Sequence, residues 1–372
     1  MSNLAGAYLL MVPSEGADMF EKSTWIRLPR NVVVGHDVLD QTVDVVDDLG
    51  LQGRPLFVTS PTPRSVAADP LAEQFRDWGV DPVIEAVDTA GIEAVESIVS
   101  SAREADASYL VGIGGGKAID IAKMAANRLD LRFLSVPTAA SHDGIVSNRG
   151  SVPEGDTRHS VEAQPPLAVV ADTGVLADAP WELTTAGCAD IISNYTAVMD
   201  WRLANRLKNV EYSEYAAALS EMTAEILVDN AGLIRPGLEE SAWLVTKALV
   251  SSGVAMSIAG SSRPASGAEH LFHISSTDWP RGQPFTATRL GSVRSITAYL
   301  HGGDQVWRDI RDALASIDAP TTAGELGIDD ETVIEALTTC HEIRDRYTIL
   351  GDGMTERAAR DVAMRTGVVG SP

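Results

Sequence analysis

The sequence predicts an α/β protein, in which an N-terminal doubly wound, mostly parallel sheet domain is followed by an all-helical C-terminal domain, with the active site in the cleft between them. From about residue 31 to 172, short apolar β-rich runs alternate with helix-period segments, which is typical of strands buried on both faces of a parallel sheet. After roughly residue 178 the strand signal stops and an alanine- and leucine-rich helical pattern begins. A length of 372 residues is enough for two such cores.

The expected strands share short length, apolar composition and flanking turn residues. They are residues 31–34, 54–59, 82–84, 109–113, 132–136 and 167–170. Between them, residues 69–78 and 91–104 carry the helix period. We expect helices from residue 181 to 366, interrupted at 260–264 and 302–304, where glycine and polar residues cluster.

The chain is strongly acidic: 29 basic and 52 acidic side chains give a formal charge of −23, and only five of the basic residues are lysine. Such a surface repels phosphate backbones, so nucleic acid is not an expected partner. Excess carboxylate with scarce lysine is typical of a protein kept soluble at very high salt, where charge repulsion is screened. We interpret this as a halophilic cytoplasm; the alternative is an ordinary acidic enzyme.

Two cysteines, Cys188 and Cys340, are too few for a disulfide framework or a thiolate metal cage. No run approaches the roughly 18 apolar residues that a membrane span needs, so we do not expect an integral membrane protein. The first residues lack the basic region of a signal peptide, and residues 1–18 are interpreted as a tail or a misassigned start.

Three consecutive glycines, Gly114, Gly115 and Gly116, follow the strand expected at 109–113 and precede a clear helix start at Lys117. Glycine lets the backbone approach a ligand, and a helix N-terminus supplies free N–H groups and a positive dipole. We therefore predict a pyrophosphate site. The segment is neither the G-x-G-x-x-G fingerprint nor a P-loop, and the alternative is a tight turn that binds nothing.

A polar cluster follows the next expected strand, in the segment SVPTAASHDG at 135–144. In open α/β sheets, ligands sit at the carboxyl ends of the strands. Thr138 and Ser141 can donate hydrogen bonds to a cofactor, and Asp143 can accept one from a substrate hydroxyl. The alternative is a turn in which Ser141 and Asp143 cap local backbone groups.

A metal site is indicated by two distant segments. Asp190 lies on an otherwise apolar helix, where an unpaired carboxylate is costly. His270 and His273 are spaced i, i+3 on one face of a second expected helix. Asp190 and His270 together could ligate a divalent ion. Taken singly, each is more often a polar residue satisfied by its neighbours than a metal ligand.

These segments together resemble the archaeal sn-glycerol-1-phosphate dehydrogenases, of the superfamily that includes glycerol dehydrogenase, iron-containing alcohol dehydrogenases and dehydroquinate synthase. The resemblance covers VGIGGGKAID, SVPTAASHDG, the Asp190 helix and SGAEHLF, and spans about residues 19 to 372. It implies reduction of a phosphorylated ketone, dihydroxyacetone phosphate, by NADH or NADPH to sn-glycerol 1-phosphate, for archaeal membrane phospholipid synthesis.

The resemblance also implies roles for residues. Asp143 and Asp190 would contact the substrate and take part in catalysis, and Asp190 with His270 would hold one zinc ion per subunit. The implied domains are residues 19–178, binding the dinucleotide, and 179–372, binding metal and substrate. The implied cofactor contacts are Gly114, Gly115, Gly116, Lys117, Ala118, Ile119, Asp120, Thr138, Ala139, Ala140, Ser141 and Ser147.

The sequence departs from this family between His273 and Ser295. The family's third zinc ligand is a histidine in an H-G-x-Q-type segment, and its position is occupied by Thr286; a substrate-facing histidine is replaced by Ile274. A GC-rich back-translation of residues 275–293, read one nucleotide upstream, encodes QLDRLAPGPAVHGHQVGVG, which puts a histidine over Thr286. The regrouped codon over Ile274 can also encode histidine.

We interpret this stretch as the product of a compensated frameshift in the gene or its record. If the residues are genuine, the metal site is weakened or dead, because losses even outside the ligand set commonly cost 10–100-fold. The alternatives are then a related metal-dependent polyol (glycerol) dehydrogenase or a catalytically impaired nucleotide-binding homologue. The sequence does not distinguish NAD from NADP as the cofactor, and we expect a homo-oligomer.

Overall fold

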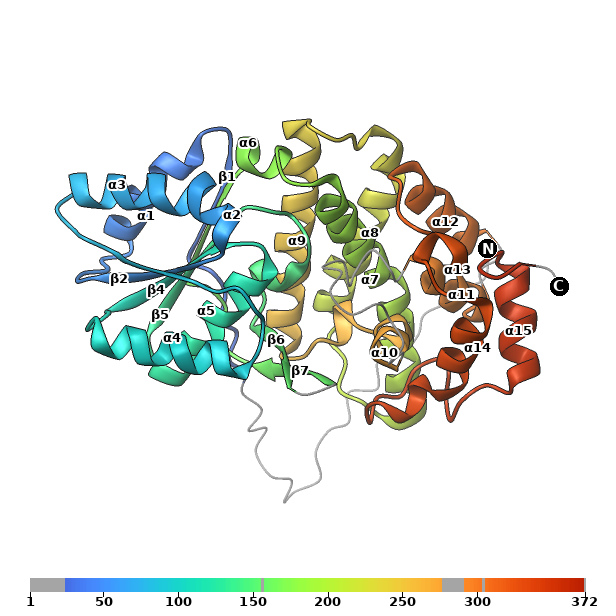
Figure 1. Cartoon of the computed structure of the whole chain (residues 1–372). Coiled ribbons are helices and arrows are strands. Elements are labelled where there is room, and N and C mark those ends of the chain that lie inside the picture. Colours follow the sequence, from blue (N-terminus) through green and yellow to red (C-terminus); the bar gives the residue numbers. More distant parts are fainter. Residues whose placement is uncertain (1–23, 155–156, 276–290, 303–304, 371–372) are drawn as a thin grey trace, which may run out of the picture.

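The computed structural model describes residues 24–154, 157–275, 291–302 and 305–370 (Figure 1). A parallel sheet with its helices forms one end of the molecule, and a bundle of helices beginning with α7 (Trp181–Lys208) forms the other (Figure 1). The predicted fold class is therefore confirmed. The tail assigned to residues 1–18 lies outside the described residues.

The sheet has six parallel strands in the order β1-β8-β5-β4-β2-β3. All six predicted strands are confirmed to within one or two residues. Their bounds are β1 Asn31–Gly35, β2 Pro55–Thr59, β3 Val83–Ala86, β4 Tyr109–Gly114, β5 Arg132–Pro137 and β8 Ala168–Asp172.

Helices cover both faces of this sheet, α1 (Thr42–Asp48) and α3 (Asp69–Asp77) on one and α4 (Ile92–Glu104) and α5 (Gly116–Leu129) on the other (Figure 1). Successive strand residues point to opposite faces. Thus Phe57 packs with the α1 and α3 side chains, whereas Leu56 packs with those of α4 and α5. This double burial explains why the strands read as continuous apolar runs.

An antiparallel hairpin of β6 (Arg149–Glu154) and β7 (Thr157–Glu162) lies beside α5 and was not predicted. Its sequence lacks the apolar run on which strand prediction depends. The short elements that complete this half are η1 Val38–Gln41, α2 Pro61–Pro63, η2 Arg64–Ala68, η3 Asp143–Ile145 and α6 Thr173–Ala177.

Beyond α6 the described chain is helical, as predicted. The long helices are α7, α8 (Glu214–Asn230) and α9 (Glu239–Ala259), and α9 ends just before the predicted break at Gly260. The others are η4 Ala231–Leu233, η5 Arg263–Ala265, α10 Ala268–Ser275, α11 Gly291–Leu300, α12 Val306–Ser316, α13 Ala323–Leu326, α14 Asp330–Thr339, η7 Cys340–Glu342 and α15 Glu356–Arg365.

The stretch 273–295, which lacks a helix period in sequence, is helical at both ends, in α10 and α11. Residues 276–290, with Thr286, lie outside the described residues, as do the side chains of His273 and Ile274. The interpretation of this stretch as a frameshift therefore stays a prediction.

Both cysteines are buried and free, as expected. Burial raises the pKa of the Cys188 and Cys340 thiols to about 12, so neither is a reactive thiolate.

By length and composition, helix α9 is apolar enough to cross a membrane, with a mean hydropathy of 1.4 over its most apolar window. It lies between the two ends of the molecule, and 56% of its apolar window is buried inside the fold (Figure 1). Val245 and Leu249 share one apolar cluster with side chains of α5 and α7. This is the environment of a core helix, and one such helix is weak evidence for a membrane span.

The loop after β5, residues 138–147, lies against the backbones of α7 and α9, and glycines make this possible. A Cβ on Gly187 of α7 would come within 2.0 Å of the Ala140 carbonyl oxygen. A Cβ on Gly253 of α9 would lie 3.0 Å from the Ser147 backbone nitrogen. Because these neighbours are backbone atoms, they cannot turn away as a flexible side chain can.

We expect Gly187→Ala to destabilise the protein by about 1–3 kcal/mol, because the new methyl group overpacks against a fixed carbonyl. Gly324→Ala in α13 is a matched control, since no atom lies within 4 Å of its Cβ position. The control should be neutral or slightly stabilising. Urea unfolding of both variants measures the difference. Equal stability of Gly187→Ala and the parent chain contradicts the close approach.

Candidate active site

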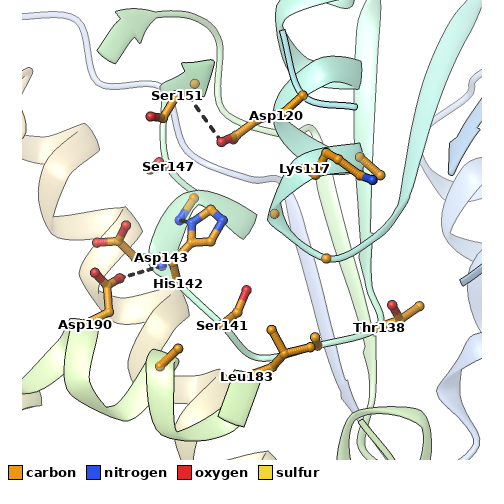
Figure 2. A pocket seen from close by; sticks show the side chains of 18 of the residues that line it. Lys117, Asp120, Thr138, Ser141, His142, Asp143, Ser147, Ser151, Leu183 and Asp190 are labelled. Atoms are coloured by element: carbon orange, nitrogen blue, oxygen red, sulfur yellow. Dashed lines mark hydrogen bonds between the residues drawn. The ribbon is translucent and has the colours of Figure 1, made fainter. Parts of the chain in front are cut away.

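A cavity of about 770 Å³ lies at the carboxyl end of the sheet, between the N-terminus of α5, the loop 138–147 and the helices α7 and α10 (Figure 2). Ligands bind at this edge in open α/β sheets. Of the predicted site residues, those that line the cavity are Gly115, Gly116, Lys117, Ala118, Asp120, Thr138, Ala139, Ser141, Asp143, Ser147, Asp190 and His270.

Three residues predicted to contact the cofactor do not line this cavity. Ile119 and Ala140 are almost fully buried in the apolar core, Ile119 on the inner face of α5. Gly114 is the last residue of β4 and turns the chain at φ +149°, which a side chain rarely tolerates. A contiguous sequence motif includes residues that face away from the cavity, and the sequence alone does not distinguish them from the residues that line it.

The glycine segment forms one wall of the cavity. Gly115 caps α5 in an extended conformation, so the first backbone N–H groups of the helix are available at the cavity. Lys117 lies at the same wall, and its Nζ donates to the Asp88 carbonyl oxygen at 2.7 Å. This wall suits an anionic group such as a pyrophosphate.

His142 lies against this wall and was given no role in the sequence analysis. A Cβ on Gly116 would overlap the His142 Nε2 position at 1.8 Å, so glycine at 116 leaves room for the ring. Its Nδ1 accepts from the Gly144 N–H at 2.8 Å (Figure 2). The ring thus lies over the N-terminus of α5, lining the cavity. Its position within the SHDG segment was the available signal.

A buried lysine holds the loop and the hairpin together. Lys123 Nζ donates to the carbonyl oxygens of Gly144 at 2.6 Å and Arg149 at 2.7 Å, and to Asp120 Oδ1 at 3.3 Å. The second Asp120 oxygen accepts from the Ser151 N–H at 3.2 Å (Figure 2). Burial lowers the pKa of Lys123, while the charge of Asp120 opposes that shift.

Two acidic residues meet where α7 reaches the loop. The Asp143 N–H donates to Asp190 Oδ2 at 2.9 Å (Figure 2), and Ser252 Oγ of α9 donates to Asp143 Oδ2 at 2.8 Å. Asn194 in turn donates to Ser252 Oγ at 3.0 Å. Burial first, and then the neighbouring Asp190 carboxylate, raise the pKa of Asp143 well above its ordinary value.

Asp190 and His270 come together although 80 positions separate them in the sequence: Asp190 Oδ1 lies 3.8 Å from His270 Nε2. The other ring nitrogen, Nδ1, lies 3.0 Å from Glu269 Oε1. Glu269 is fully buried and accepts from the Gly267 N–H at 2.6 Å. A carboxylate that fixes one imidazole nitrogen, leaving the other toward an acidic partner, is the arrangement of metal-ligating histidines.

This pair fits a divalent cation by donor type, with one carboxylate oxygen and one imidazole nitrogen. Within the described ranges, no cluster of three or more histidine, cysteine, aspartate or glutamate side chains is placed to hold a metal. The described chain therefore offers two ligands, and the position of the expected third, Thr286, falls outside it.

Comparisons with known proteins show the family of the chain. The model of the iron-containing alcohol dehydrogenase family matches residues 33–180. A glycerol-1-phosphate dehydrogenase (NAD(P)+) from Halobacterium salinarum is 66% identical over 94% of this chain and 100% of its own length. That of Haloarcula marismortui is 67% identical over the same shares, and that of Methanococcoides burtonii is 51% identical over 95% and 98%.

Among solved structures, a probable glycerol dehydrogenase from Sinorhizobium meliloti matches with a TM-score of 0.74 at 21% identity, over 92% of this chain and 98% of that one. The glycerol dehydrogenase of Schizosaccharomyces pombe matches equally at 17% identity, over 93% and 92%. The fold is thus that of these glycerol dehydrogenases. By its similarity to the full-length relatives, the chain belongs to the glycerol-1-phosphate dehydrogenase family.

We expect Lys123→Met to destabilise the protein by about 3–5 kcal/mol, because it leaves Asp120 and two carbonyl groups buried without their cation. The loss should be similar at low and high KCl, since a buried pair is poorly screened. Arg76→Met removes an exposed partner of Asp81 and should change stability little. Denaturant unfolding measures both. A loss for Lys123→Met no larger than for Arg76→Met contradicts the role of Lys123.

Proposed function

We propose that the chain reduces dihydroxyacetone phosphate with NADH or NADPH to sn-glycerol 1-phosphate, the glycerol backbone of archaeal membrane phospholipids. One observation carries this proposal. A single cavity has an anion-binding helix N-terminus on one wall and the Asp190–His270 pair on the other. The names of the relatives agree with this reaction.

The dinucleotide would lie along the wall formed by α5 and the loop. Its pyrophosphate would accept hydrogen bonds from the backbone of Gly115, Gly116 and Lys117. Thr138, Ser141 and Ser147 line the same cavity and would donate to the rest of the cofactor. Bound there, NAD(P)H supplies the hydride, and the protein supplies its orientation.

Asp190 and His270 would hold a divalent cation, for which we propose zinc. An ion held by these two side chains would supply Lewis-acid polarisation of the ketone carbonyl. Glu269 would fix the tautomer and orientation of His270. The third ligand would be the histidine that the regrouped reading frame places over Thr286.

Asp143 would position the substrate. Its carboxyl group is held by Ser252, which Asn194 fixes in turn, so it is set before substrate arrives. Asp143 would bind a substrate hydroxyl, beside the Asp190 carboxylate. Leu183, Ala186 and Met256 give this side of the cavity an apolar lining that excludes water and strengthens these interactions.

The present sequence favours one second candidate, a nucleotide-binding homologue with impaired catalysis, because residue 286 is threonine. This candidate binds NADH but turns over no ketone. We further propose a cytoplasmic homo-oligomer; the net charge of −23 suits a high-salt cytoplasm and argues against nucleic-acid partners.

The restored chain carries Ile274→His and has residues 275–293 replaced by QLDRLAPGPAVHGHQVGVG. With zinc, we expect it to oxidise NADH or NADPH in the presence of dihydroxyacetone phosphate, and chelation to abolish this rate. The product should resist sn-glycerol-3-phosphate dehydrogenase, which acts on the other enantiomer. The present chain should be far slower. Reduction of unphosphorylated dihydroxyacetone at an equal rate favours a polyol dehydrogenase instead.

We expect Glu269→Gln in the restored chain to weaken zinc binding about 10–100-fold. The amide orients His270 less firmly than the carboxylate does, and it does not balance the positive charge of the bound ion. Competition with a chelator measures the affinity. Glu221→Gln, which breaks a carboxylate–arginine pair with Arg202 away from the cavity, should leave zinc binding unchanged. Equal zinc affinity in Glu269→Gln and the parent would show that Glu269 does not support the metal site.

A further inference from the structure

Two arginines from distant parts of the chain line the cavity. Arg149 is the first residue of β6, and Arg344 follows η7 in the C-terminal half. Neither belongs to a motif that the sequence analysis singled out. Arg149 also lies 4.0 Å from Glu162 across the hairpin, at the outer edge of the site.

Two more arginines, Arg346 and Arg263, bind the backbone and side chains of the same region. Arg346 donates to the Ser266 carbonyl oxygen and, at 2.8 Å, to Ser262 Oγ. Arg263 donates to the Tyr347 carbonyl oxygen at 2.9 Å. Ser262 and Ser266 line the cavity, as does Arg344. The contacts of Arg346 with these two serines therefore fix the segment that carries Arg344 against the cavity wall.

Arg149, Arg263 and Arg344 lie close enough to Arg346 to disfavour its charge. Burial, and then Arg149, lower the pKa of Arg344. Burial, and then Arg263 and Arg344, lower the pKa of Arg346 to about 10. The carboxylate of Glu269 partly offsets the positive charge of Arg346. Arg149 and Arg344 line the cavity itself, and two positive side chains at one cavity attract anionic groups.

Arg344 lies on the metal-pair side of the cavity. Ser266, whose carbonyl oxygen accepts from Arg346, is four residues before His270, and the segment of Arg344 contacts α10 through η7. Arg149 reaches the cavity from the hairpin beside α5, where Lys123 donates to its carbonyl oxygen. An anion that Arg344 binds on the side of His270 is therefore a part of the substrate rather than the pyrophosphate, which the α5 N-terminus would bind.

We propose that Arg149 and Arg344 form the subsite for the phosphate monoester of the substrate, with Arg346 and Arg263 as positioning residues. This inference rests on the proposed function and names the groups that distinguish a phosphorylated from a free polyol. Guanidinium groups suit it because they bind phosphate oxygens in pairs.

Calorimetric titration of the present chain with glycerol 1-phosphate, glycerol and inorganic phosphate tests this without turnover. We expect the parent to bind glycerol 1-phosphate and phosphate but not glycerol. Arg344→Gln and Arg149→Gln should each weaken glycerol 1-phosphate binding about 10–100-fold, the loss of a charged hydrogen bond. Arg344→Lys should lose less, and Arg76→Gln nothing. Unchanged NADH binding shows that each variant is folded.

The outcomes separate the two proposals. If the parent binds glycerol 1-phosphate and both glutamine variants bind it equally well, the arginine subsite is wrong and the proposed function stands. If the variants lose NADPH affinity instead, the cluster binds the cofactor phosphate and the inference is overturned. If the parent binds NADH but no phosphomonoester, both the inference and the proposed substrate are wrong.

Discussion

The site depends on how closely three helices approach the loop 138–147. Gly187 and Gly253 bring the backbones of α7 and α9 into contact with it, and Lys123 of α5 binds its carbonyl groups on the remaining side. Because the loop is fixed on three sides, Asp143 lies beside Asp190 without a lid having to close. Held rigidly, such polar groups need little reorganisation when a substrate binds.

Electrostatics divides the cavity into regions of different sign. The α5 N-terminus and the arginines favour anionic groups, whereas Asp190 and Glu269 place carboxylate oxygens on either side of the His270 ring. A buried acidic cluster of this kind is costly unless a cation joins it. The same cavity therefore suits a phosphorylated substrate, a dinucleotide and a divalent ion together.

Much of this was predictable from sequence, because the strands are buried on both faces and read as apolar runs. The glycine and hydroxyl motifs located part of the cavity lining, because each motif directly follows a buried strand. The β6–β7 hairpin was missed, since its strands are polar. Lys123 read as an ordinary helical lysine, and Arg149 and Arg344 carry no local signal, because only the fold brings them together. Burial of Ile119 and Ala140 likewise depends on packing partners elsewhere in the chain.

We propose that Asp190 and His270 hold the metal of a dehydrogenase site. Zinc titration of the restored chain, alone and with Asp190→Asn or His270→Gln, tests it most directly. We expect one tightly bound zinc per chain, lost in both variants while NADH still binds. Tight zinc binding that survives both substitutions contradicts the assignment of these two ligands, because the metal would then lie elsewhere.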